Sequence, residues 1–165
     1  MVTNLLKVGV KMEINYSNQK IITSKKSIFL AGPTPRSEEV NTWREEALKI
    51  LDKLEFDGLV YVPELEFDTR EFNYDYQVCW ERKALQNSTV IVFWIPRNLR
   101  TLPGLTTNIE FGYWICKDSK KVIYGRPDDS ERNEYLDWFY KIETGREPLN
   151  NLNDLLKNAI LIANN

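Results

Sequence analysis

Two glutamates occupy positions in which a carboxylate could take part in catalysis. Glu110 follows the proline- and glycine-containing stretch "LPGLTT", and Glu81 lies in the segment "WERK". The whole chain contains no histidine, which excludes imidazole acid–base chemistry, serine–histidine and cysteine–histidine nucleophile pairs, and histidine-bound zinc. Any catalysis therefore has to use carboxylates, Tyr, Lys, Cys or groups of the substrate itself.

Glu110 has two interpretations. If Thr107 is the N-cap of a helix, "TNIE" is a capping box, and Glu110 turns back to the N-cap amide in a purely structural role. Alternatively, a carboxylate in the first helical turn, at the positive end of the helix dipole, could act as a nucleophile. Gly112 favours the second interpretation. A glycine inside a helix costs about 1 kcal/mol relative to alanine, which suggests that something approaches the backbone closely there.

Glu81 is the second candidate because of its place on a predicted helix. At 3.6 residues per turn, it shares one face with Tyr74, Val78 and Leu85. A carboxylate on an inward apolar stripe needs a partner, a proton or a function. We therefore expect Glu81 and Glu110 to face one pocket.

Three arginines lie in loops that follow predicted strands. Arg36, Arg97 and Arg100 could hold an anionic group such as a phosphate, although a plain surface cation is the simpler interpretation of each. The loop "GPTPR" has one glycine and lacks the G-x-G-x-x-G spacing, which argues against a dinucleotide-binding Rossmann domain.

Strands and helices alternate along the chain. Apolar runs predict strands at 26–32, 58–64, 89–96 and 120–127, with a short hairpin or an edge strand among the first 26 residues. Helices are predicted at 38–54 with Ser37 as N-cap, at 74–86, from the stretch "LPGLTT" to 117, at 130–143 and at 148–163. This α/β order predicts a parallel sheet with helices on both faces, and ligands bind such sheets beyond the carboxyl ends of the strands.

The composition limits the possible partners. The 165 residues predict a single domain, and a net charge of −2 without a basic stripe argues against a nucleic-acid polymer as partner. The longest apolar run, "VIVFWIP", is too short to cross a membrane, and the N-terminus lacks the pattern of a signal peptide, so we expect a cytoplasmic protein. Cys79 and Cys116 have no metal-ligand spacing and are predicted to be free thiols that each fill a helix face. No metal or cofactor is expected.

Several motifs resemble those of one known family, in the same order along the chain. The nucleoside 2-deoxyribosyltransferase-like proteins are similar to this sequence in "SIFLAGPTPRS", "TWREEAL", "VYVPE", "YDYQVCWERKAL", "VIVFWIPRNLRTLPGLTTNIEFGYW" and "KVIYGRPDDSERNEYLDWFY". The resemblance covers residues 27–140. The N-terminal extension, 1–26, and the C-terminal helix, 141–165, lie outside the resemblance.

The resemblance implies a flavodoxin-like, doubly wound fold and cleavage of the N-glycosidic bond of a nucleoside without a cofactor. The family's nucleophile corresponds to Glu110, which would attack the anomeric carbon and form a covalent deoxyribosyl-enzyme. The carboxylate at Glu81 would orient the sugar or the attacking glutamate. The residues expected to bind the base and the sugar are Phe29, Ala31, Gly32, Pro33, Thr34, Arg36, Gly104, Thr107 and Asn108.

The sequence departs from the well-studied transferases at two positions. Those enzymes carry an aspartate where this chain has Gly104, six residues before Glu110, and an aspartate where it has Glu81. Three functions stay open: transfer of 2-deoxyribose between bases, hydrolysis of a nucleoside or a nucleoside monophosphate, and nucleotide binding without turnover. The resemblance also implies a role in nucleotide salvage and a homo-oligomer in which neighbouring subunits help to close the sites.

Overall fold

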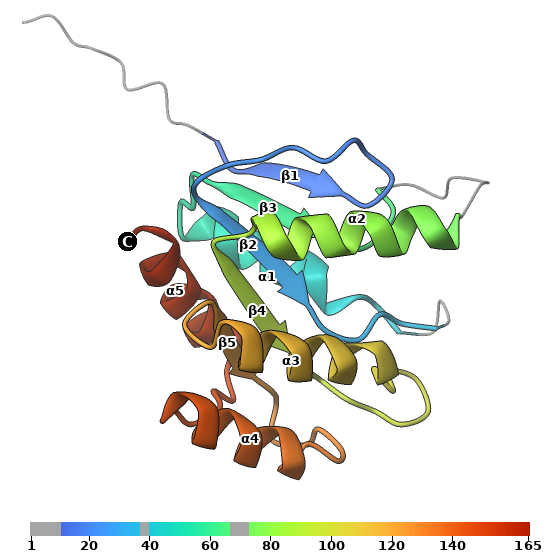
Figure 1. The fold of residues 1–165 in the computed structure, drawn as a ribbon, viewed down its shortest axis with the longest axis vertical. Coiled ribbons are helices and arrows are strands. Elements are labelled where there is room, and N and C mark those ends of the chain that lie inside the picture. The colour runs from blue at the N-terminus through green and yellow to red at the C-terminus, as the bar shows by residue number, and fades with distance from the viewer. Residues whose placement is uncertain (1–10, 37–39, 67–72) are drawn as a thin grey trace, which may run out of the picture.

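The computed structural model describes residues 11–36, 40–66 and 73–165. Five parallel strands form one sheet in the order β1-β3-β2-β4-β5 (Figure 1). The strands are β1 (Glu13–Tyr16), β2 (Ser27–Ala31), β3 (Leu59–Val62), β4 (Val90–Trp94) and β5 (Val122–Gly125). The four predicted strands are confirmed. The early segment is an edge strand and not a hairpin, because β1 pairs in parallel with β3, with Glu13 opposite Leu59.

The strand order makes this a flavodoxin-like, doubly wound sheet. From β2 the chain crosses to β3 on one side and then returns past β2 to β4 on the other. The direction of winding reverses there, so the helix that joins β2 to β3 and the helix that joins β3 to β4 cover opposite faces of the sheet. The carboxyl ends of β2 and β4 flank this reversal, which is where ligands bind in folds of this kind.

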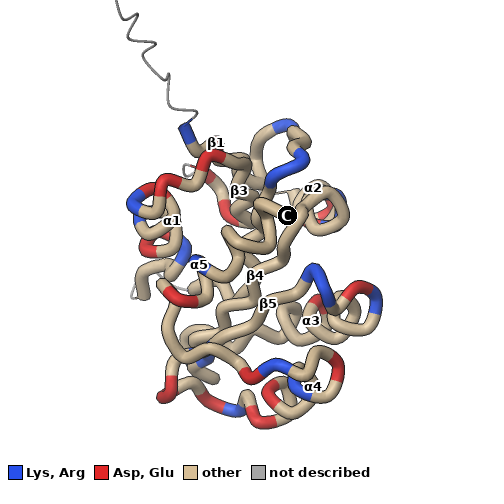
Figure 2. Tube along the Cα trace, turned by 90° about the vertical axis from the view of Figure 1, so that its left-hand side faces the viewer, with Lys and Arg blue, Asp and Glu red and all other residues tan. Residues whose placement is uncertain are grey.

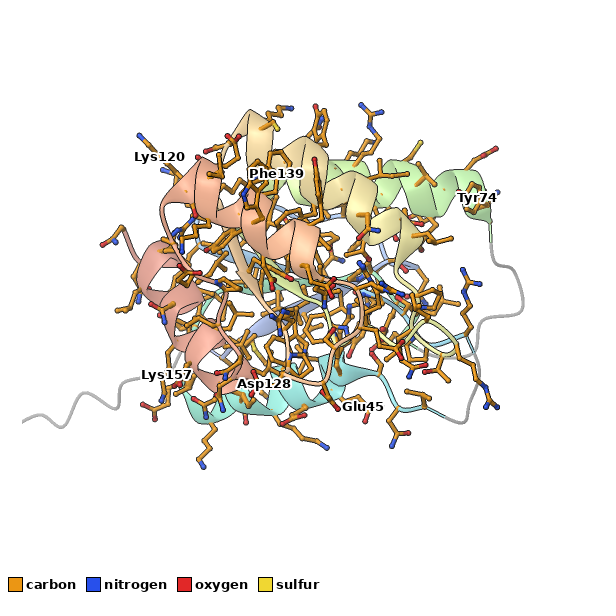
Figure 3. All side chains as sticks on the ribbon, turned by 90° about the horizontal axis from the view of Figure 1, so that it is seen from below. Glu45, Tyr74, Lys120, Asp128, Phe139 and Lys157 are labelled. Carbon is orange, nitrogen blue, oxygen red and sulfur yellow. The ribbon has the colours of Figure 1, made fainter. Side chains whose placement is uncertain are left out.

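Helices cover both faces of the sheet, as predicted. One layer holds α1 (Trp43–Lys53) and α5 (Leu152–Ala163), and the other holds α2 (Tyr74–Asn87), α3 (Leu105–Lys117) and α4 (Glu134–Thr144). Figure 3 shows the three layers edge-on, with α2, α3 and α4 above the sheet and α1 and α5 below it. Tyr74, which begins α2, lies at the opposite end of the molecule from Lys120, which precedes β5 (Figure 3).

Successive residues of each strand point to opposite faces of the sheet, so the buried core has one part on each face. In β2, Ile28 and Leu30 pack against α1 and α5, whereas Phe29 and Ala31 pack beneath α2, α3 and α4. All residues of β2, β3, β4 and β5 are buried, as expected for parallel strands that are covered on both sides.

Helix α1 begins later than the sequence predicts. The predicted cap, Ser37, and the first two predicted helical residues lie outside the described residues, and Val40, which is described, is not helical. The N-cap is Thr42, whose extended backbone lets its Oγ1 accept a hydrogen bond from the amide of Arg44 at 3.3 Å. Thr42 is a favourable cap, and it places Glu45 and the glutamate after it in the first turn, where they complement the helix dipole.

Helix α3 begins earlier than predicted, so the proposed capping box is wrong. Gly104 is the N-cap, with φ of 62° and ψ of 42°, and no side chain caps the helix. Glycine adopts this left-handed conformation without a steric penalty, so the chain can turn into the helix before Thr107. Glu110 consequently lies in the second turn and not in the first. A Cβ placed on Gly112 meets nothing within 4 Å, so the close approach inferred from that glycine does not occur within the described chain.

The surface carries charges of both signs over its helices and loops (Figure 2). Both cysteines are free thiols, as predicted, but they are exposed and do not fill buried helix faces. None of the helices in the described part of the chain combines the length and the apolar character that a membrane span requires.

Candidate active site

A cavity of about 320 Å³ opens at the carboxyl ends of the strands. Its walls come from the segment that follows β2, from α2 and from the first turns of α3. Its lining residues are Phe29, Ala31, Gly32, Pro33, Thr34, Arg36, Arg44, Pro63, Tyr74, Gln77, Val78, Glu81, Pro103, Gly104, Leu105, Thr106, Thr107 and Glu110. Both candidate carboxylates therefore face one cavity.

Glu81 is half-buried because of how α2 lies on the sheet. The side chains of α2 that are buried are Trp80, Ala84 and Leu85, and Glu81 stands beside this stripe. The predicted stripe is wrong at its N-terminal end, where Tyr74 is 68% exposed. That end of α2 extends past the sheet, so its side chains line the mouth of the cavity and do not pack in the core.

Glu110 is half-buried on α3. The neighbouring Phe111 is fully buried and packs edge-to-face on Phe93 and Tyr124, with ring centroids 5.2 and 5.1 Å apart. This aromatic contact sets the rotation of α3 about its axis, and Glu110, one position earlier, consequently faces the cavity. Thr106 and Thr107 precede Glu110 by four and three residues, so all three lie on the same side of the helix and all three line the cavity.

The two carboxylates have different proton affinities. Burial, together with the charge of Glu81, raises the pKa of Glu110 to about 7, against the opposing charge of Arg44. Burial also raises the pKa of Glu81, but there a hydrogen bond from Gln77 and the charge of Arg44 act against the rise. Gln77 Nε2 donates to Glu81 Oε1 at 2.7 Å, which favours the ionised form of Glu81. Below neutral pH the pair therefore holds its proton on Glu110.

Arg44 lines the cavity, and the sequence analysis did not identify it. Its side chain is fully buried: Nε donates to the Leu30 carbonyl at 2.9 Å and Nη2 to the Gly32 carbonyl at 2.7 Å. Nη1 donates to Thr34 Oγ1 at 3.0 Å and pairs with the carboxylate of Glu64. The helical periodicity of α1 could have identified Arg44, because positions 44, 47 and 51 share the buried face of this helix.

Trp43 holds the same segment from the preceding position. Its Nε1 donates to the Pro33 carbonyl at 3.1 Å, and its ring lies so close to Gly32 that an added Cβ would come within 2.9 Å of it. The same Cβ would be 2.1 Å from the Trp94 carbonyl oxygen, so only glycine fits at position 32. The first two residues of α1 thus fix the segment after β2, which forms one wall of the cavity.

The structure separates the remaining predicted residues. Asn108 does not line the cavity, because its side chain accepts a hydrogen bond from the guanidinium of Arg97. Arg97 is itself buried, and its guanidinium donates to the Arg132 carbonyl at 2.9 Å. Its hydrogen bonds therefore connect segments of the protein. Arg100 is exposed and lies outside the cavity. Of the three loop arginines, Arg36 lines it.

A second groove, of about 310 Å³, runs between α2 and α3 and reaches the same two carboxylates. Among its lining residues, Tyr74 is 68%, Ile109 74% and Tyr113 53% exposed. Within the described residues, no three His, Cys, Asp or Glu side chains are grouped in a way that could hold a metal ion.

One family model matches the chain. The family is described as "Nucleoside 2-deoxyribosyltransferase like", and the match covers residues 25–128. This range includes β2, β3, β4 and β5 and every lining residue of the cavity that holds Glu81 and Glu110. Among curated proteins, none matches the chain.

Proposed function

The chain belongs to the nucleoside 2-deoxyribosyltransferase-like family, and from this we propose that it transfers 2-deoxyribose between nucleobases. The observation that supports this most is the pair of half-buried carboxylates, Glu81 and Glu110, in one cavity of a protein that has no histidine. Paired carboxylates are the groups by which retaining glycosidases cleave a glycosidic bond.

In the proposed reaction, a carboxylate oxygen of Glu110 attacks C1′ of the nucleoside. The base leaves with the electron pair of the C1′–N bond and takes up a proton from the solvent, and a glutamyl-deoxyribosyl ester remains. A nitrogen of a second base then attacks C1′ and loses its proton, and the electron pair of the ester C–O bond returns to Glu110. The transition state of each step resembles an oxocarbenium ion, which nearby negative charge stabilises.

Glu81 has the properties of the supporting carboxylate. Its hydrogen bond from Gln77 fixes the side chain and favours its charge, so it can orient a sugar hydroxyl or the attacking glutamate. Phe29, Pro63 and Tyr74 offer flat apolar surfaces in the same cavity, on which a base could stack.

Hydrolysis is the second candidate, and the groove between α2 and α3 favours it. In a single chain this groove opens both carboxylates to solvent, so water could take the place of the second base. A binding module without turnover is less consistent with the site, because a carboxyl pKa raised to about 7 beside a second carboxylate is typical of catalytic groups.

One experiment separates these functions. The purified protein is incubated with a 2′-deoxynucleoside, with and without a second base, and the products are separated by chromatography. A new nucleoside supports transfer, and free 2-deoxyribose formed in both samples supports hydrolysis. If neither product forms, the proposal of an enzyme acting on deoxynucleosides fails.

We further propose that the protein is a cytoplasmic homo-oligomer that serves nucleotide salvage. The exposed apolar side chains of α3, Leu105, Ile109 and Tyr113, are suited to a second copy of the chain. Ile109 and Tyr113 border the groove between α2 and α3. A second copy lying there would cover the open side of the carboxylate pair.

A further inference from the structure

The side-chain amide of Gln77 is held in one orientation. Its Nε2 donates to the Pro63 carbonyl at 3.3 Å and to Glu81 Oε1 at 2.7 Å. An amide nitrogen carries two hydrogens, so these two partners use both of them. Pro63 follows the last residue of β3, and Glu81 lies one turn after Gln77 on α2. The amide therefore joins the end of a strand to the helix that covers it.

A rotation of this amide by 180° is unfavourable. It would turn Oε1 toward the Pro63 carbonyl and the Glu81 carboxylate, so that both hydrogen bonds are lost and oxygen lies beside oxygen. A protonated Glu81 could donate to the rotated amide, but the Pro63 carbonyl has no proton to give. A freely rotating glutamine can present either a donor or an acceptor to a ligand, whereas Gln77 presents its oxygen.

This oxygen is open to a ligand. Within the described part of the chain, Gln77 Oε1 accepts no hydrogen bond. It is also not one of the buried side-chain atoms that lack a partner, so it is accessible. Gln77 lines the cavity that holds Glu81 and Glu110. A second hollow, of about 730 Å³, shares Thr34, Pro63 and Gln77 with this cavity, so a ligand that reaches Gln77 has room to extend past it.

The lining of the cavity indicates which part of a nucleoside reaches Gln77. On α3, Thr106 lies one turn before Glu110 and offers a hydroxyl to the sugar. On α2, the apolar side chains of Tyr74 and Val78 line the cavity beside Gln77. The flat, apolar faces of a base suit this wall. The polar edge of the base then meets the amide of Gln77.

The spacing along α2 agrees with this placement. Gln77 and Glu81 are four residues apart, so they lie on one face of the helix, about 6 Å from each other along its axis. In the proposed reaction C1′ of the sugar lies at the carboxylates of Glu81 and Glu110. The base begins at C1′, and its far edge lies about one ring system away. Gln77 is therefore in position to contact that edge.

We propose that Gln77 Oε1 selects nucleobases that carry an exocyclic amino group. Adenine and cytosine present an N–H donor at this edge, which completes the fixed acceptor. Hypoxanthine and uracil carry a carbonyl oxygen at the same position, where it would face the amide oxygen with no proton between them. This inference rests on the proposed function, because the attack of Glu110 on C1′ sets the position of the sugar.

The test compares two pairs of substrates that differ in this one group. Deoxyadenosine is compared with deoxyinosine, and deoxycytidine with deoxyuridine, as substrates of the full chain. In at least one pair we expect kcat/KM of the amino member to exceed that of the oxo member by about tenfold or more, because the oxo member leaves the acceptor unpaired. Equal values in both pairs, or a preference for the oxo member, would overturn the inference.

Two variants of Gln77 test the residue itself. Gln77→Met keeps the length of the side chain and removes its polar atoms. The support of Glu81 is lost as well, so kcat/KM should fall for both members of a pair, but their ratio should approach one. Gln77→Lys presents donors alone and should reverse the preference toward the oxo member. If Gln77 only supports Glu81, both members lose activity equally, and an amino preference that persists in both variants contradicts the assignment.

The matched control lies on the same helix. Lys83 is exposed and lines neither the cavity nor the groove between α2 and α3. Lys83→Met should leave both kcat/KM values and their ratio unchanged. Circular dichroism of the three variants shows whether α2 and the fold are kept.

Binding separates this inference from the proposed function. Calorimetric titration of Glu110→Gln with the two members of each pair measures affinity without turnover. If no substrate is cleaved but the amino member binds more tightly and Gln77→Met abolishes the difference, the selection by Gln77 stands and the proposed reaction fails. If nucleosides are cleaved and both members bind and react equally, the reaction stands and the selection fails. The absence of both cleavage and binding overturns both.

Discussion

At the scale of single residues, the role of Glu110 decides the proposed chemistry. Glu110→Gln keeps the size of the side chain and removes the negative charge, and an amide is a poor nucleophile. We expect a folded variant with essentially no turnover. A slow 2-fluorinated deoxynucleoside, or its 5′-monophosphate, should add a sugar-sized mass to the wild type in intact-protein mass spectrometry and none to the variant. The control is Glu143→Gln on the exposed face of α4. An adduct that persists in Glu110→Gln would exclude Glu110 as the nucleophile.

The raised pKa of Glu110, about 7, makes activity depend on pH. Attack requires the ionised carboxylate, so we expect kcat/KM to rise with pH and to level off above about 7. A profile that falls between about pH 6 and 8 would contradict this assignment.

The same pKa makes stability depend on pH in the opposite direction. The pKa is raised above the ordinary glutamate value of 4.5, so the folded protein binds this proton more tightly than the unfolded chain. The stability that this protonated Glu110 contributes is complete below about pH 4.5 and is lost as the pH rises through about 7. Glu110→Gln avoids this loss. At about pH 8 we expect the variant to be more stable than the wild type by roughly 1–3 kcal/mol, and at about pH 4 by much less. Urea denaturation at the two pH values measures both differences, and equal stabilities at about pH 8 would count against the burial of Glu110.

At the scale of elements, α1 shapes a site to which it contributes no catalytic residue. Arg44 joins the start of α1 to Leu30, Gly32 and Glu64. Arg44→Met would remove the cationic partner of Glu64, which would keep only its hydrogen bond from Thr42 Oγ1, and the guanidinium donors to the carbonyls of Leu30 and Gly32. We expect a loss of about 3–5 kcal/mol in the free energy of unfolding, as for a broken buried ion pair.

The control for this prediction lies in the same helix. Lys53 is exposed in the last turn of α1, and Lys53→Met should change the free energy of unfolding by no more than about 0.5 kcal/mol. Chemical denaturation of the variants gives both values. If Arg44→Met unfolds at the same denaturant concentration as the wild type, Arg44 does not fix the segment after β2.

At the scale of the whole molecule, the exposed apolar face of α3 predicts self-association. We expect the wild type to sediment as a homo-oligomer. Ile109 is 74% exposed in the single chain, so Ile109→Lys should dissociate the oligomer and leave the circular dichroism spectrum unchanged. Leu161→Lys, at a 64% exposed position of α5 in the opposite layer, is the matched control. A wild type that sediments as a monomer at micromolar concentration rules out this assembly.

Local patterns in the sequence were sufficient for the α/β architecture. Continuous apolar runs predicted the strands from β2 to β5, because a parallel strand covered on both faces has almost no exposed position. Helical periodicity identified α2, α4 and α5, and the absence of histidine directed attention to Glu81 and Glu110. The family motifs, too, are properties of the sequence alone.

Only the tertiary structure decided where α3 begins and what the arginines do. The start of α3 depends on the left-handed backbone of Gly104 and on the space beside it, where an added Cβ would lie 3.2 Å from Pro33. No local propensity records either feature. Arg36 and Arg97 read alike in sequence, yet the first lines the cavity and the second is bonded to Asn108. Arg44, which the sequence analysis did not identify, is buried against carbonyls. A side chain's partners come from segments far away along the chain, so its role follows from how the elements pack and not from its neighbours in sequence.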